Sequence, residues 1–206
     1  MHPNPAFRQI SQVRNIGFAR ERGFGLLAVG TDTTPLISHI PFLLSEDGGL
    51  AEFHLVRSNP IARMLATARP ARLAVQGPHS YVSPDWYGVT DQVPTWNYVA
   101  VHLVGEVTLQ PQETMRDLLD RQSAHYEDRL QPKPPWLTAK MTPEVLDRLM
   151  RQIVPCAMRV DEIAATWKLG QNKPDEVRLR AAGHLAPAAM GQETDLLAAL
   201  MRDPPD

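Results

Sequence analysis

The order of apolar and polar positions predicts a helix first and a strand-rich region after it. Helical spacing from Pro5 to about Glu21, behind Asn4 as an N-cap, predicts an amphipathic helix that ends at Gly23. Short apolar runs bounded by turn residues then predict four strands. These runs are FGLLAV (Phe24 to Val29), PLISHIPFLL (Pro35 to Leu44), LAEFHLV (Leu50 to Val56) and ARLAVQG (Ala71 to Gly77).

Turn chemistry indicates how these strands connect. Asp47-Gly48-Gly49 predicts a β-hairpin between the second and third runs. Ser58-Asn59-Pro60 predicts a cap and a short helix between the third and fourth runs. The run from Thr95 to Gln110 is rich in aromatic and β-branched residues, which favours one long strand.

The later part of the chain alternates between the two periods. Helices are predicted from Pro111 to about Asp128 and after Thr142, and a strand from Val154 to Leu169. Two short helices follow. Sequential strands with hairpin links predict a mainly β (α+β) fold, an antiparallel barrel decorated with helices.

Composition and charge exclude several classes. The chain has 206 residues and a formal net charge of −2, which gives no footprint for binding a polyanion. One cysteine, Cys156, cannot form an intramolecular disulfide, and the histidine spacings predict no metal site. The absence of a long apolar run disfavours a membrane span, so we expect a cytoplasmic protein.

The usual catalytic and nucleotide motifs are also missing. Ser80, Ser83 and Ser123 lack a nucleophile-elbow context, and Cys156 lies in an apolar strand where a buried, inert thiol is expected. The glycines of GFGLLAVG interrupt a strand instead of following one, which argues against a dinucleotide fingerprint.

Four groups of residues remain as candidates for binding. With a two-residue hairpin loop, His39 and His54 would share one sheet face, whereas a three-residue loop would separate them. Arg57 beside the predicted helix entry is typical of an anion site or of an ordinary strand-to-helix joint. The segment from Gln76 to Tyr98 carries the aromatic and amide groups that suit a flat ligand or a subunit interface. The cluster Lys168, Gln171, Asn172 and Lys173 suits phosphate or a simple turn.

Several of these runs resemble the PaiB-like family of FMN-binding negative transcriptional regulators. The matching runs are HIPFLL, RSNP, QGPHSYVSPDWY, VPTWNYVAVHLVGEV and KLGQNK. The resemblance implies an FMN-binding split β-barrel over residues 1–175, with 176–206 as a C-terminal helical tail of the same domain. It also implies a homodimer with FMN at the subunit interface.

The resemblance assigns cofactor contacts without fixing their individual roles. The implied FMN-binding residues are His39, His54, Arg57, Asn59, Gln76, His79, Ser80, Ser83, Trp86, Trp96, Asn97, Lys168, Gln171 and Asn172. We expect the phosphate near Arg57 and Lys168 and the ring against the aromatic segment. In KLGQNK a glycine, Gly170, replaces the usual serine, which would weaken a phosphate contact made by that serine.

The same residues are compatible with further functions. The sequence has no basic recognition helix, so we expect regulation by flavin sensing or through a partner instead of direct DNA binding. A flavin-dependent oxidoreductase would use His79 or His102 to move protons. A haem protein would use a strand histidine as axial ligand. A cofactor-free dimeric binding module would use the aromatic segment for packing only.

Overall fold

The computed structural model describes residues 1–188 and 190–206, which divide into two compact units. The first unit contains residues 1–18, 75–102 and 163–206, and the second contains residues 19–74 and 103–162. Each of three long strands contributes residues to both units: β5 (Arg69–Val82), β6 (Thr95–Leu109) and β7 (Ile153–Lys168). The strand order is β2-β1-β5-β6-β7-β4-β3, and β8 pairs with β5.

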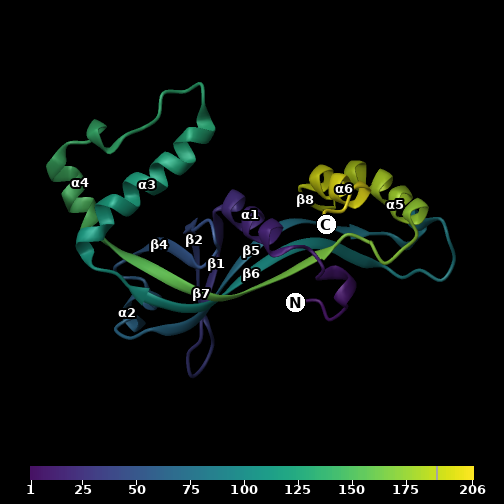
Figure 1. The fold of residues 1–206 in the computed structure, drawn as a ribbon, viewed down its shortest axis with the longest axis horizontal. Coiled ribbons are helices and arrows are strands. Elements are labelled where there is room, and N and C mark those ends of the chain that lie inside the picture. Colours follow the sequence, from purple (N-terminus) through teal and green to yellow (C-terminus); the bar gives the residue numbers. More distant parts are fainter. Residues whose placement is uncertain (189) are drawn as a thin grey trace. The chain divides into compact units, whose positions relative to one another are not determined.

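Antiparallel pairs build the second unit (Figure 1). β1 (Phe24–Val29) lies between β2 (Leu36–Pro41) and β5, and β4 (Leu50–Val56) lies between β3 (Leu43–Leu44) and β7. Burial alternates along β1 and β4, so every second side chain enters the core. The helical segments are α2 (Pro60–Met64), η3 (Gln112–Thr114), α3 (Met115–Glu127), η4 (Asp128–Leu130), η5 (Thr138–Lys140) and α4 (Pro143–Met150).

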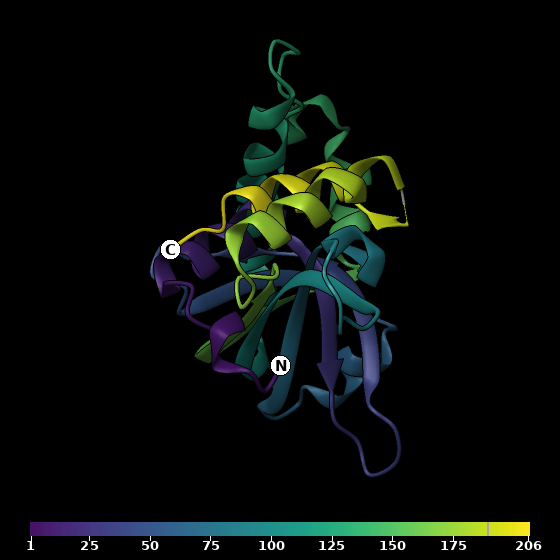
Figure 2. The same cartoon turned by 90° about the vertical axis from the view of Figure 1, so that its right-hand side faces the viewer.

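Two helices and several short elements complete the first unit. α5 (Asp175–Ala188) and α6 (Thr194–Arg202) lie side by side in both views and pack against each other (Figures 1 and 2). The other elements are η1 (Pro5–Phe7), η2 (Pro84–Tyr87) and β8 (Gly191–Gln192), while α1 (Gln12–Arg22) begins in this unit. Within the described part of the chain, no helix combines the length and apolar character needed to cross a membrane.

The N-terminal helix differs from the sequence prediction because it is broken. Asn4 caps only the three-residue η1, through its Oδ1 and the backbone N–H of Ala6 (2.9 Å). A new helix, α1, begins at Gln12. It ends as predicted at Gly23, whose φ of +57° is in the left-handed region that favours glycine.

The predicted hairpin between β3 and β4 is confirmed, but its loop is longer than the two or three residues considered from the sequence. The ladder pairs Leu44 with Ala51, and the backbone N–H of Ser45 donates to Leu50 O at 2.9 Å. Residues 46–49 therefore form a four-residue loop, in which Asp47 Oδ1 accepts from the Gly49 N–H. His39 belongs to β2, which ends before this ladder, so the hairpin argument does not bring it to His54.

The aromatic segment from Gln76 to Tyr98 is strand at both of its ends instead of loop throughout. β5 continues to Val82, and β6 begins at Thr95. Between them, η2 contains Pro84–Tyr87, and Ser83 and residues 88–94 are irregular. Strand pairing therefore controls where most of these aromatic side chains point.

Candidate functional site

An aromatic face lies on β5 and β6 in the first unit, formed by Gln76, His79, Tyr81 and Trp96. The Trp96 ring centroid lies 6.0 Å from that of His79 and 6.4 Å from that of Tyr81. The Gln76 side-chain amide lies 3.1 Å from His79 Nδ1 in a hydrogen bond. Trp96 is 48% exposed, so its ring is accessible to a ligand.

A change of phase in β5 produces this face. Every second residue of β5 is buried as far as Gly77. Pro78 is buried directly after it, so the alternation shifts by one residue, and Ser80 and Val82 are the next buried positions. Gln76 and His79 consequently share a side despite an odd spacing. Gly77 is required here because a Cβ would lie 2.7 Å from the Phe18 ring and 2.9 Å from Val99 Cβ.

Three of the predicted cofactor residues near this face have structural contacts. Ser80 is fully buried, and its Oγ donates to Met190 O at 2.8 Å, next to the β5–β8 pairing. Ser83 is the N-cap of η2. Trp86 stacks on His184 of α5, with ring centroids 6.2 Å apart.

The second unit contains the four earlier candidates, His39, His54, Arg57 and Asn59. Exposed His39 stacks on Phe24. The Arg57 guanidinium donates to Arg151 O (2.9 Å), Ile153 O (3.3 Å) and Gln112 Oε1 (2.7 Å). Much of its hydrogen-bonding capacity is therefore used within the protein.

His54 and Asn59 likewise have surroundings of their own. His54 lies half-buried on β4 and interacts with Gln122 of α3, and burial lowers the pKa of its imidazole. Asn59 caps α2 through Ile61 N–H and donates from Nδ2 to Ser38 Oγ at 3.0 Å. These contacts do not join His39, His54, Arg57 and Asn59 into one site. The role of these four residues in cofactor binding stays a prediction.

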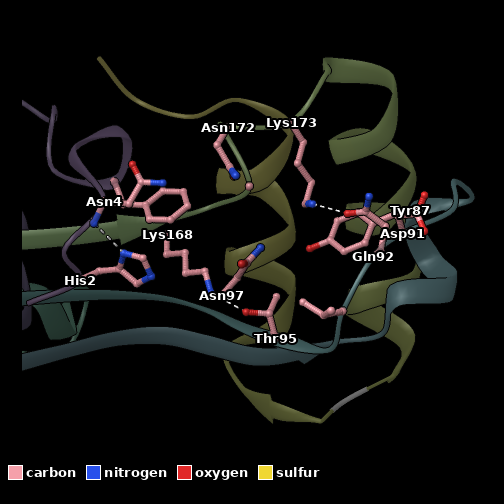
Figure 3. A pocket seen from close by; sticks show the side chains of 13 residues that line it. His2, Asn4, Tyr87, Asp91, Gln92, Thr95, Asn97, Lys168, Asn172 and Lys173 are labelled. Atoms are coloured by element: carbon pink, nitrogen blue, oxygen red, sulfur yellow. Dashed lines mark hydrogen bonds between the residues drawn. The ribbon is translucent and has the colours of Figure 1, made fainter.

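A separate cavity of about 480 Å³ in the first unit, which we call the lysine pocket, is lined by three further predicted residues (Figure 3). Of the predicted set, Asn97, Lys168 and Asn172 line it, and so does Lys173 of the same sequence cluster. Gln171 does not line the cavity: its amide bonds to Leu169 N and Trp167 O within the turn. The remaining lining residues are His2, Asn4, Phe7, Tyr87, Asp91, Gln92, Val93, Thr95 and Gly170.

The pocket also contains residues from distant segments, which the sequence did not predict. The N-terminal residues reach the pocket because the His2 backbone N–H donates to Thr166 Oγ1 on β7, at 3.1 Å. A contact between residues 164 positions apart has no local sequence signal. Tyr87 did lie within the resembling run QGPHSYVSPDWY, so that run was the signal that could have identified it.

Two lysines that form no ion pair within residues 1–188 and 190–206 define the pocket's electrostatics. Lys168 Nζ donates to Thr95 Oγ1 and Lys173 Nζ donates to Gln92 Oε1, and both acceptors are neutral. The pKa of Lys168 is lowered, first by burial and second by the charge of Lys173. The pKa of His2 is lowered in the same way, first by burial and second by the charge of Lys168.

Gly170 fits the backbone of this pocket. Its φ of +82° lies in the left-handed region, and the Lys173 N–H closes the turn onto Gly170 O at 3.0 Å. The departure from serine is thus compatible with the local turn. The donors and rings of the aromatic face and of the pocket fit a flavin, which has a flat heteroaromatic ring and a phosphate.

Comparison with known proteins gives a family and a relative. A family model described as "Putative FMN-binding domain" matches residues 1–162. The "Protease synthase and sporulation protein PAI 2" of Bacillus subtilis is 29% identical over 172 residues, which cover 82% of each chain.

Solved structures of low sequence identity share the fold. An FAD and heme binding protein from Mycobacterium smegmatis has a TM-score of 0.56 at 16% identity, covering 78% of this chain and 73% of that one. A conserved hypothetical protein from Mycobacterium tuberculosis has a TM-score of 0.57 at 12% identity, covering 82% and 92%. These matches confirm the predicted split-barrel fold.

Proposed function

Because the chain belongs to the family described as "Putative FMN-binding domain", we propose that it is a negative transcriptional regulator that senses FMN without contacting DNA itself. The resemblance drawn from the sequence is confirmed, and FMN is the cofactor that the family assigns. The regulatory part of the proposal is supported by that resemblance and by the name of the Bacillus relative.

The aromatic face carries this proposal. A flavin ring needs a flat apolar surface and polar groups for its ring heteroatoms. Trp96 and Tyr81 supply the surface, while Gln76 and His79 supply hydrogen-bonding groups beside it. We therefore place the ring on this face, with Trp96 as its main contact.

The contacts of the N-terminal arginines support an indirect route to DNA. Arg14 lies over the Trp167 ring, 6.0 Å from the ring centroid, and Arg20 donates to Leu44 O at 3.2 Å. A recognition helix presents its basic side chains outward to a groove. Arg14 is exposed in spite of this contact, so the net charge of −2 is the stronger reason to favour a partner or ligand signal over direct binding.

Bound FMN would supply a redox centre that reports on the state of the cell. The protein's own residues would hold and orient it, and the exposure of Trp96 leaves room for a second subunit to cover the ring. A cytoplasmic homodimer is the assembly that we propose for this role.

A flavin titration tests the binding part of the proposal. FMN fluorescence and absorbance, measured with light scattering, should show a dimer that binds FMN. Trp96→Ala should weaken binding at least tenfold, whereas Trp136→Ala, a tryptophan of the second unit, should leave it unchanged. Equal FMN affinity in Trp96→Ala and the parent would contradict the placement of the ring.

Transcript profiles test the regulatory part. In a strain that lacks the protein, complementation with the parent should repress a set of transcripts. Complementation with Trp96→Ala should leave the same transcripts derepressed. Repression by a variant that no longer binds FMN would refute flavin sensing. Sustained oxidation of NADH or NADPH by the FMN-loaded protein would instead favour a flavin-dependent oxidoreductase.

A haem titration addresses the remaining cofactor. A Soret band that is lost in His54→Ala and His79→Ala would favour haem over FMN.

A further inference from the structure

We propose that the lysine pocket binds the phosphate or carboxylate group of a small ligand, with Lys168, Lys173 and Tyr87 as its donors. The family model ends at residue 162, so Lys168 and Lys173 lie beyond the segment that it matches. The resemblance implies Lys168 as a flavin contact, so the proposal deepens the proposed function if the oxyanion is the flavin phosphate; a site for any other oxyanion does not depend on that function.

The first reason is uncompensated charge. Within residues 1–188 and 190–206, the ion pairs join neither Lys168 nor Lys173 to a carboxylate, although both ammonium groups line one cavity. Asp91 is the acidic residue among the lining residues, and it is exposed. Two partly desolvated ammonium groups near each other favour an anion between them.

The second reason is an unused donor. Tyr87 is only 1% exposed, and its hydroxyl has no hydrogen-bond partner among the described residues. Burial raises the pKa of this phenol, so it stays protonated and can donate. Figure 3 shows the hydroxyl on the cavity side of the ring. A buried polar group without a partner is costly, and an oxyanion would satisfy it.

The rest of the lining defines the class of ligand. The Lys173 ammonium lies 4.3 Å from the centroid of the Tyr87 ring, and the Lys168 ammonium lies 6.0 Å from that of Phe7. Side-chain amides of Asn4, Asn97 and Asn172 add neutral polar groups. The cavity volume is in the range for small molecules, so the ligand is a small organic oxyanion.

Strand alternation separates this pocket from the aromatic face. Thr95 and Asn97 line the cavity, whereas Trp96, His79 and Tyr81 do not. Neighbouring residues of a strand point to opposite sides, so Trp96 turns away from the side occupied by its two neighbours. The two surfaces can therefore be tested with separate substitutions.

Inorganic phosphate and acetate are the probes for the first experiment, at constant ionic strength in a chloride buffer. Phosphate should raise the melting temperature of the parent and of the control Lys140→Gln, whose lysine lies in the second unit. The double variant Lys168→Gln/Lys173→Gln should lose at least tenfold in phosphate affinity. No response in the parent to either probe, or an equal response in the double variant, would overturn the proposal.

Tyr87→Phe separates binding from folding. The phenol hydroxyl makes no hydrogen bond within the described residues, so its removal should leave the melting temperature equal or higher. Phosphate affinity should nevertheless fall at least threefold. Unchanged phosphate affinity in Tyr87→Phe would remove the hydroxyl from the proposed donors and contradict the assignment.

Comparison of FMN with riboflavin identifies the source of the oxyanion. If the double lysine variant weakens FMN but not riboflavin, the pocket holds the phosphate of the flavin itself. If both flavins bind unchanged while the phosphate response is lost, the pocket serves a separate metabolite. A protein that binds phosphate but no flavin would refute the proposed function and still support this site.

Discussion

Arg180 on α5 is hydrogen-bonded to the backbone of Tyr87: its Nη1 donates to Tyr87 O at 2.8 Å. The same nitrogen donates to Gly88 O at 3.0 Å. α5 thereby fixes the turn that places the Tyr87 ring beside Lys173. α5, which lies beyond the matched family segment, thus shapes the lysine pocket.

Gly88→Ala should destabilise the first unit. Gly88 has a φ of +63°, and a Cβ would lie 2.2 Å from Arg180 Nη1. The left-handed conformation alone costs about 1–2 kcal/mol for alanine, and loss of the Arg180 contacts adds to it. Urea unfolding should show this decrease in the free energy of unfolding.

Gly183→Ala is the matched control on α5. A Cβ at this position meets no atom within 4 Å, and the residue is helical and exposed. Alanine should raise the free energy of unfolding by about 0.5–1 kcal/mol through helix propensity. Equal effects of the two alanine substitutions would contradict this account of the turn.

Asn15→Leu should destabilise the packing of α1 on β7. Trp167 Nε1 donates to Asn15 Oδ1 at 2.8 Å, and both residues are buried. Leucine leaves the indole N–H without a partner, which costs about 1–3 kcal/mol. Urea unfolding followed by tryptophan fluorescence measures the loss, and a free energy of unfolding equal to that of the parent would refute it.

His54 should make stability depend on pH. Burial lowers the pKa of His54 in the folded state below its ordinary value of 6.5, so the unfolded chain binds the proton more tightly. The free energy of unfolding should therefore fall as the pH drops below about 6.5, until it passes the folded pKa.

Urea unfolding between pH 7.5 and 5 tests the role of His54. His54→Gln should flatten this dependence. The remaining slope is expected from His2 and His125, whose pKa values burial also lowers. An unchanged slope in His54→Gln would exclude His54 as a source.

Cys156 should be unreactive in the folded protein. It is 1% exposed, and burial raises the pKa of its thiol to about 12. The thiolate is the reactive form, so alkylation by iodoacetamide at pH 8 should be slow until urea unfolds the chain. Rapid labelling of the native protein would show that β7 opens locally.

Local patterns predicted several elements because their cause is local. β1 and β4 have the predicted bounds, since turn residues flank each run and burial alternates along it. The prolines and glycines of the aromatic segment are typical of loops, so its residues predict a loop. Pairing with β8 and the phase change at Gly77 make part of it strand instead.

The candidate sites were predictable only in part. Trp96, His79 and Gln76 were in the predicted set, and the structure brings them together. The set also contained Ser80 and Trp86, whose contacts lie within the protein. A motif identifies residues that a family shares, but it does not separate a binding contact from a packing contact.

By itself, the sequence determined the strand-rich class, the family and the buried character of Cys156, because each follows from short-range pattern or composition. Only the tertiary structure decided which polar groups meet. His2, Tyr87, Asn97 and Lys168 come from four separate segments, and long-range pairing brings them into one cavity. The two lysines that make the cavity positive lie in one run, KLGQNK, but the sequence does not show which distant residues surround them.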